Sequence, residues 1–368
     1  MSQLILQDGT QYCGENFGAA REATGEVVFS TGMTGYPESL TDPSYAGQIL
    51  VLTYPLIGNY GVPAENLKKK QLKTKMSADP FTAEILTKKF ESAKIQIAGL
   101  IVSEYSQKYS HSEASLSLSA WLKRENIPAL TRVDTRALTQ KLRKQGTILG
   151  KISLQKKFLK FCKPAQSNLV QQVSIPKPIF YRAGNKKVVL IDCGLKLSIL
   201  RNLLSRNVSV WRLPFDADLR QFDFDGICLS SGPGDPIRVP ETCHTIKREL
   251  KNKKPIFGIC LGHQILALAA GGHTFKLPYG HRSQNQPVQN LKTGHCFITS
   301  QNHGYAVDPK LPSDFQITFQ NLNDKSVEGL QHKTKPFVSI QFHPEAQPGP
   351  ADTEFLFDEF VAKLGKSS

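Results

Sequence analysis

The chain has 368 residues, and its 46 lysines and arginines outnumber its 31 aspartates and glutamates, which gives a formal net charge of +15. Its hydrophobic and charged fractions, 40% and 21%, are those of an ordinary globular protein long enough for two or three domains, so global disorder is excluded. The lysines occur in runs without interleaved aromatic residues or a recognisable reading motif. We therefore expect solvated lysine faces and no nucleic-acid partner.

The cysteines and the apolar runs indicate the kind of compartment in which the chain is expected. The seven cysteines are odd in number and scattered, and they include no C-x-x-C pair, which argues against a disulfide framework and a zinc site. We expect no bound metal and a reducing compartment. Because neither a secretory signal, a transit peptide nor a membrane-spanning run is recognised, we expect no membrane partner, and either a bacterial cytoplasm or the plastid stroma of an organelle-encoded chain.

Residues 1–152 combine short β-rich runs, at 27–29, 49–53 and 95–102, with two helical patterns. The clearer helix is bounded by Asp134, which suits an N-cap, and by Gly146, which suits the residue past its end. The run 29–48 is dense in turn formers and hydroxyl groups and is interpreted as a loop. We expect a mixed α/β domain over residues 1–152.

Two stretches carry little structural signal. Residues 66–89 are rich in lysine with a polar interior and are interpreted as an exposed excursion. The stretch from 154 to 187 contains three prolines, lysines and glutamines, and we interpret residues 153–186 as an interdomain linker.

Residues 187–368 change to an alternation of strands and helices. Strands are expected at 188–192, 208–213 and 226–229, and helices at 197–204 and 241–250. This alternation predicts an α/β domain with a mostly parallel sheet, covered by helices on both faces, whose ligands lie beyond the carboxyl ends of the strands.

The stretch around Cys260 carries the strongest chemical signal. A short apolar strand ends in Gly258-Ile-Cys-Leu-Gly262, and an Ala/Leu helix follows. This is the spacing of a nucleophile elbow, in which small flanking residues permit a strained turn and free backbone N–H groups can bind an oxyanion. The alternative is a buried free cysteine in a βα turn, which is common in apolar runs.

Downstream residues favour the nucleophile. The strand-like run 337–345 ends with His343 and Glu345 two positions apart, where one carboxylate can orient and stabilise an imidazolium. Cys260, His343 and Glu345 would form a triad by role. A purely structural role is the alternative for His343 and for three other histidines, His263, His281 and His303.

Several motifs resemble one family. Gly258-Ile-Cys-Leu-Gly-His-Gln264, Gly232-Pro-Gly-Asp235 and His343-Pro-Glu345 are similar to the signatures of class I glutamine amidotransferases. The runs 31–36, 40–45 and 53–60 resemble the small, glutamine-hydrolysing subunit of carbamoyl-phosphate synthetase, and the runs 301–307 and 344–350 fit the same family. The resemblance covers almost the whole chain.

The resemblance implies that L-glutamine is hydrolysed by Cys260, His343 and Glu345 through a thioester, with oxyanion donors from the backbone of Leu261 and the 232–234 loop. It also implies a set of residues that hold glutamine, with Ser44 reaching in from the N-terminal domain: Ser44, Gly232, Gly234, Leu261, Gln264, Asn302, Gly304 and Tyr305.

The same resemblance implies a division of labour. The chain contains no P-loop, because Gly365-Lys-Ser367 lacks the leading glycine and the strand. We expect no cofactor here and a large partner subunit that uses ATP, Mg²⁺ and bicarbonate and receives ammonia through a tunnel. The two subunits would form a heterodimer or a larger oligomer.

Two features depart from the family pattern. The excursion at 66–89 is longer than the usual connection, and Ser283-Gln284 replaces a glycine pair. Two alternatives stay open: another class I amidotransferase or cysteine hydrolase, which would share only the C-terminal half, and a non-catalytic assembly subunit, which would be expected to have lost a triad residue.

Overall fold

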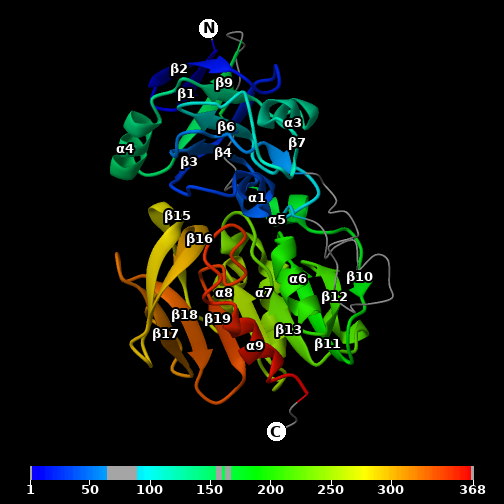
Figure 1. The fold of residues 1–368 in the computed structure, drawn as a ribbon. Helices are drawn as coiled ribbons and strands as arrows, with labels where there is room; N and C mark the ends of the chain where they lie inside the picture. The colour runs from blue at the N-terminus through cyan, green and yellow to red at the C-terminus, as the bar shows by residue number, and fades with distance from the viewer. Residues whose placement is uncertain (1, 64–88, 155–159, 162–166, 366–368) are drawn as a thin grey trace. The chain divides into compact units, whose positions relative to one another are not determined.

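The computed structural model describes residues 2–63, 89–154, 160–161 and 167–365 (Figure 1). The lysine-rich excursion expected at 66–89 lies outside this range except for its last residue. The described residues up to Leu169 form one compact unit, and those from Val170 form another. Within the described residues, no helix is both long and apolar enough to cross a bilayer.

The first unit is built on a closed β-barrel with the strand order β1-β2-β8-β6-β4-β3-β9. The pairs β3–β4, β4–β6 and β6–β8 are parallel and the others are antiparallel. The runs predicted at 27–29 and 49–53 correspond to β3 and β4, whereas only the second half of the run 95–102 forms a strand, β6, which begins at Gly99. The barrel strands are β1 (Ser2–Leu6), β2 (Gln11–Asn16), β3 (Ala23–Ser30), β4 (Gln48–Leu52), β6 (Gly99–Val102), β8 (Ala129–Thr131) and β9 (Ile148–Ser153).

Helix α4 (Thr135–Gln145) begins and ends where the sequence predicts. The Asp134 side chain accepts a hydrogen bond from the Ala137 N–H at 2.9 Å, and Gly146 follows with a φ of 85°. The run 29–48, interpreted as a loop, instead contains α1 (Tyr36–Thr41) and a 3₁₀ helix (Pro43–Tyr45). A proline stands in the first turn of each, where its fixed φ favours the start of a helix. The unit also contains α3 (Leu118–Arg124) and a small pair of strands, β5 (Val62–Pro63) and β7 (Ala114–Leu116).

The second unit contains a 10-stranded sheet with the order β10-β12-β11-β13-β14-β19-β18-β16-β15-β17. The expected parallel arrangement holds from β12 to β19, and antiparallel strands continue the sheet on both sides. The strands are β10 (Ile179–Tyr181), β11 (Lys186–Asp192), β12 (Val208–Pro214), β13 (Gly226–Leu229), β14 (Ile256–Ile259), β15 (Thr274–Asn290), β16 (Cys296–Val307), β17 (Phe315–Asn321), β18 (Val327–His332) and β19 (Phe337–Ile340).

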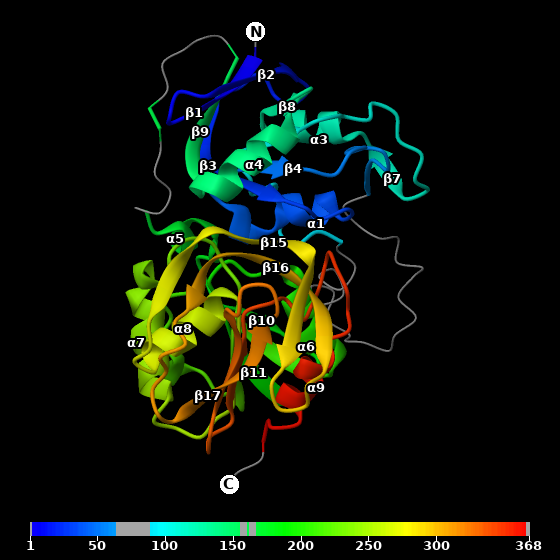
Figure 2. The same ribbon diagram turned by 90° about the vertical axis from the view of Figure 1, so that its left-hand side faces the viewer.

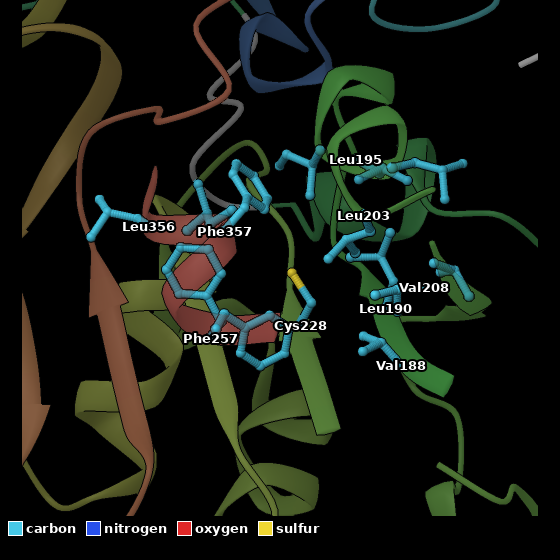
Figure 3. Packing of buried hydrophobic residues seen from close by; sticks show 14 of the residues in the cluster. Val188, Leu190, Leu195, Leu203, Val208, Cys228, Phe257, Leu356 and Phe357 are labelled. Carbon is cyan, nitrogen blue, oxygen red and sulfur yellow. The ribbon is translucent and has the colours of Figure 1, made fainter. Parts of the chain in front are cut away.

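Helices cover both faces of the parallel strands, as the alternation of elements predicts. Because side chains alternate along a strand, Val188 and Leu190 lie on one face, in the same buried cluster as residues of α6 (Leu197–Ser205) and α9 (Phe355–Val361). Figure 3 shows Leu190 near Leu203 of α6, and Phe357 of α9 near Phe257. Val189 and Ile191 pack on the opposite face with α7 (Pro240–Glu249) and α8 (Leu261–Ala269). The two helix layers are visible in Figure 2.

The second unit begins inside the segment interpreted as a linker. Helix α5 (Leu169–Val173) straddles the boundary, and β10 pairs with β12 through Phe180 and Trp211. The linker interpretation therefore does not hold for the described residues from Val170 onward. Strand β10 has only three residues, which is too short to show a periodicity in the sequence. The prolines and lysines around it are therefore the stronger signal, and they are typical of a connector.

Candidate active site

Cys260 occupies a sharp turn between β14 and α8. Its φ of 55° and ψ of −105° are values that residues with a side chain rarely adopt, at a cost of about 1–3 kcal/mol. The flanking glycines are required by close packing, since a Cβ on Gly258 would lie 2.6 Å from the Gly262 carbonyl oxygen, and one on Gly262 would lie 2.4 Å from that of Leu229. The turn is the nucleophile elbow that the glycine spacing predicts.

The triad residues leave neighbouring parallel strands. The Cys260 N–H donates to the Ile340 carbonyl at 2.9 Å, so the elbow is tied to the end of β19. His343 Nδ1 lies 2.6 Å from Glu345 Oε1, and all three side chains are buried. The expected extended strand through 345 is wrong, because β19 ends at Ile340, and His343 and Glu345 meet in the turn beyond it.

Electrostatics hold the histidine in its charged form. Burial lowers the pKa of His343, but the carboxylate of Glu345 outweighs burial, and Cys260 adds to its effect, so the pKa ends above its ordinary value. Burial raises the pKa of Glu345, but Lys196 and His343 outweigh burial and hold it below its usual range. No hydrogen bond of ordinary length reaches His343 Nε2 from the described residues, and Cys260 is the nucleophile that interacts with the imidazole.

Lys196 is a member of the site that our sequence analysis missed. Its Nζ lies 3.0 Å from Glu345 Oε1 and donates to the Ala346 carbonyl at 2.6 Å. The lysine is held at the start of α6 by a turn in which Asp192 Oδ1 accepts the N–H groups of Gly194 and Leu195. A signal was present, because this lysine interrupts the otherwise largely apolar run 193–200.

The Gly-Pro-Gly loop follows β13 and lies beside the elbow. The Gly262 N–H donates to the Ser230 carbonyl at 3.1 Å, which joins the first turn of α8 to the start of this loop. A Cβ on Gly232 would lie only 2.0 Å from the Cys193 carbonyl oxygen, and Gly234 has a φ of 89°. Leu261 is the first residue of α8, where backbone N–H groups point out of the helix.

Strand β16 brings more of the predicted residues to the cysteine. The Cys260 thiol donates to the Asn302 carbonyl at 3.7 Å. Gln264 Nε2 donates to the Tyr305 carbonyl at 2.8 Å, so α8 is joined to the same strand. The His343 N–H donates to the Ser300 carbonyl at 2.9 Å. The part of β16 that also carries Gly304 is thus joined to the elbow, to α8 and to the turn with the catalytic histidine.

Ser44 lies in the first unit, in the 3₁₀ helix that follows Asp42. It is buried, its N–H donates to Asp42 Oδ1 at 2.8 Å, and its hydroxyl has no hydrogen-bond partner among the residues that the structure describes. Its contact with glutamine stays a prediction. The departure at Ser283 lies within β15 opposite Gln301, at a register shift, and Gln286 Nε2 donates to the Ser283 hydroxyl at 2.8 Å.

His263, next to the elbow, is a structural residue. Burial lowers its pKa to about 3, so the ring is neutral, and Nδ1 lies 2.9 Å from the Ser339 hydroxyl. The structural alternative therefore holds for His263, whereas His343 belongs to the triad.

Two family models match the chain. The model of class I glutamine amidotransferases matches residues 189–363, which contain the triad, and together the fold and the site define a class I glutamine amidotransferase domain. The model of the carbamoyl-phosphate synthase small chain, CPSase domain, matches residues 4–152. A different class I amidotransferase would share only the C-terminal half, so the second match excludes that alternative. The chain belongs to the family of carbamoyl-phosphate synthase small chains.

Whole-chain relatives agree with this assignment. The arginine-specific small chain of carbamoyl phosphate synthase from Neosartorya fischeri is 47% identical over 374 residues, which are 99% of this chain and 80% of that one. The multifunctional protein CAD of Squalus acanthias is 46% identical over 368 residues, but the chain spans only 16% of its length. A glutamine amidotransferase structure from Thermotoga maritima has 20% identity and a TM-score of 0.37 and covers 49% of this chain and 84% of that one.

Proposed function

We propose that this chain is the glutamine-hydrolysing subunit of a carbamoyl-phosphate synthase. The observation that carries the proposal is the placement of Cys260, in a strained elbow bound to the end of β19, beside the buried His343–Glu345 pair that follows β19, in a member of this family. The triad is intact, whereas a non-catalytic assembly subunit would be expected to have lost one of its members.

The first half of the reaction forms a thioester. Cys260 Sγ, as the thiolate that pairs with protonated His343, attacks the side-chain amide carbon of glutamine, and the resulting oxyanion is stabilised by the backbone N–H of Leu261 and one from the 232–234 loop. His343 gives its Nε2 proton to the leaving nitrogen, while Glu345 holds the other ring nitrogen and stabilises the charge. The C–N bond breaks and ammonia departs.

The second half regenerates the cysteine. His343, now neutral, takes a proton from water, and the hydroxide attacks the thioester carbonyl. The C–S bond breaks, glutamate leaves, and the proton on His343 restores the starting state. Ser44, Gln264 and the Asn302–Tyr305 segment would hold the amino-acid part of glutamine during both steps.

Ammonia is the product that the family passes on. A large partner subunit would bind ATP, Mg²⁺ and bicarbonate and combine the ammonia into carbamoyl phosphate, so this chain itself would need no cofactor. The printed name of the Neosartorya relative points to arginine biosynthesis, and we expect the carbamoyl phosphate to serve pyrimidine biosynthesis as well. Carbamoyl phosphate is the intermediate common to both routes.

The test uses the chain co-purified with its large subunit. Cys260→Ser is expected to abolish carbamoyl-phosphate synthesis from glutamine and to leave synthesis from free ammonia, because only the ammonia source is lost. Cys243→Ser, a cysteine of α7 outside the site, is the matched control and should retain both activities. Loss of both activities in a folded Cys260→Ser complex would contradict the proposed division of labour.

A further inference from the structure

A second buried polar cluster lies behind the glutamine-binding part of β16. It contains His281 from β15, Gln301 and His303 from β16, and Glu328 from β18, all of which are buried. None of them belongs to the triad. Burying so many polar side chains is costly unless each is held by specific contacts, so the cluster requires a structural or functional reason.

His281 joins the surface to the centre of this cluster. Its Nε2 lies 2.9 Å from Asp324 Oδ2, and its Nδ1 lies 2.9 Å from Gln301 Oε1 and 3.7 Å from Glu328 Oε1. Burial lowers the pKa of His281, but its contacts with Asp324 and Glu328 raise it to about 9. A protonated His281 is a donor at both nitrogens, and this fixes the Gln301 amide with its oxygen toward the ring.

Glu328 supplies the carboxyl group at the centre of the cluster and is fully buried, and this burial raises its pKa. Its Oε1 accepts a hydrogen bond from Asn321 Nδ2 at 3.2 Å, and its Oε2 has no partner within the described part of the chain. Its backbone carbonyl accepts the N–H of Gln341 at 2.9 Å, two residues before the catalytic His343. The Glu328 backbone therefore contacts the segment that leads from β19 to the triad, while its side chain faces the histidine cluster.

Gln301 transmits the arrangement to the glutamine site. Its Oε1 lies 3.0 Å from His303 Nε2, and the other nitrogen of His303 lies 2.8 Å from the Tyr305 carbonyl. That same carbonyl accepts the Gln264 amide, and the next residue after Gln301 is Asn302, whose carbonyl meets the Cys260 thiol. A rotation of Gln301 would therefore move the strand positions that hold substrate.

We propose that Glu328 and His281 are positioning residues for glutamine: acting through Gln301, they hold β16 in the conformation in which Asn302 and Tyr305 bind substrate. The inference rests on the proposed glutaminase function. It assigns no chemical step to either residue, because neither reaches Cys260. Their expected effect is on the KM for glutamine, with little effect on ammonia-dependent synthesis.

The same three side chains, His281, His303 and Glu328, have ligand atoms within 4.8 Å of one another, which is a spacing that a metal ion could use. The contact of His281 Nδ1 with the Gln301 oxygen favours a network without metal, because a ring nitrogen that donates a proton cannot bind an ion. Elemental analysis of the purified complex separates the two explanations.

The experiment compares Glu328→Leu, Glu328→Gln and His281→Asn in the complex with the large subunit. Glu328→Leu removes the carboxylate acceptor at nearly constant side-chain volume. We expect it to raise the KM for glutamine about tenfold, which is the effect of leaving one buried hydrogen-bonding group unpaired. Glu328→Gln keeps an acceptor oxygen and should restore a KM close to that of the wild type. Glu249→Leu, which removes a buried carboxylate from α7, is the matched control and should leave the KM unchanged.

Two further readouts distinguish positioning from damage. Alkylation of Cys260 by iodoacetamide, which does not need the glutamine pocket, should proceed at the wild-type rate in Glu328→Leu. Inactivation by a glutamine-like diazoketone should slow about tenfold, in line with the KM. If Glu328→Leu does not fold, His281→Asn carries the same test from the other end of the contact.

Three results would overturn the inference. One is an unchanged KM in both folded Glu328→Leu and His281→Asn; another is a KM in Glu328→Gln as high as in Glu328→Leu. The third is one tightly held metal ion per chain whose removal reproduces the KM effect. Failure of the proposed function gives a different result, because the wild-type complex itself would then show no glutamine-dependent synthesis.

Discussion

Replacing Gly232 with alanine tests whether the Gly-Pro-Gly loop is placed by contact with the turn after β11. The new Cβ would lie 2.0 Å from the Cys193 carbonyl oxygen, whereas Cβ contacts under 3.0 Å essentially do not occur, so the loop must shift by about 1 Å. The carbonyl cannot easily yield, because the Cys193 N–H is bound to Ser230 Oγ at 2.9 Å and Asp192 holds the residues that follow.

A shift of this size at an oxyanion loop is expensive for catalysis. Misplacing a catalytic group by 1 Å can cost about 10²-fold in rate, which corresponds to roughly 2.7 kcal/mol of transition-state stabilisation. We expect Gly232→Ala to lower the glutaminase kcat by about that factor, while ammonia-dependent synthesis in the assembled enzyme is unchanged. The assay is glutamate release under saturating glutamine.

The control is Gly226→Ala at the opposite end of the same strand, β13. Its Cβ would meet the end of the Leu364 side chain at 2.4 Å, a contact that side-chain rotation can relieve. Thermal unfolding should show a lower Tm for this variant, with kcat within about twofold of the wild type. A folded Gly232→Ala enzyme with kcat within about threefold of the wild type would refute the placement of the loop.

Three other changes probe binding, the buried lysine and the histidine cluster. Ser44→Ala should raise the KM for glutamine more than it lowers kcat, and a purely kcat effect would place Ser44 elsewhere. Lys196→Met should lower the free energy of unfolding by about 3 kcal/mol in urea titrations, because it leaves the buried Glu345 carboxylate without its cationic partner. Lys186→Met, at an exposed lysine, is the control and should change the free energy of unfolding little. Equal effects of the two substitutions would contradict a stabilising Lys196–Glu345 pair. His281 faces Asp324, Glu328 and His303, and its pKa is about 9 in the folded protein against 6.5 in the unfolded chain. Its protonation therefore stabilises the fold fully below pH 6.5, and this contribution of roughly 3 kcal/mol to the free energy of unfolding is lost as the pH rises through 9. His281→Asn should lack this fall, and a wild-type unfolding free energy that runs parallel to that of the variant from pH 6.5 to 9.5 would contradict it.

The elements that could be predicted are those whose signal is local. Gly258 and Gly262 mark the elbow because the backbone there comes too close for any side chain, and Asp134 and Gly146 mark a helix through its caps. Such requirements involve only residues near in sequence, so one sequence suffices to detect them.

The elements that could not be predicted depend on distant partners. Strand β15 is dominated by polar residues and contains two register shifts, so it lacks the alternation by which strands are detected. The apolar run around Lys196 indicates its burial but not its partner, because Glu345 is more than a hundred residues away, and Glu328 looks like an ordinary surface charge because other strands of the sheet bury it. Their pairing is a property of the tertiary fold.

The placement of Cys260 and His343 after adjacent parallel strands limits where activity can be controlled. Their separation is set by main-chain hydrogen bonds, Cys260 to Ile340 and His343 to Ser300, and these bonds form whatever side chains surround them. A bound partner could not retune this distance without breaking the centre of the sheet. Adjustable coupling between subunits must therefore work on a part whose position depends on side-chain contacts, and the portion of β16 supported by Gln301 is such a part. Interface variants that uncouple glutamine hydrolysis should accordingly change the affinity for glutamine while the alkylation rate of the cysteine stays constant.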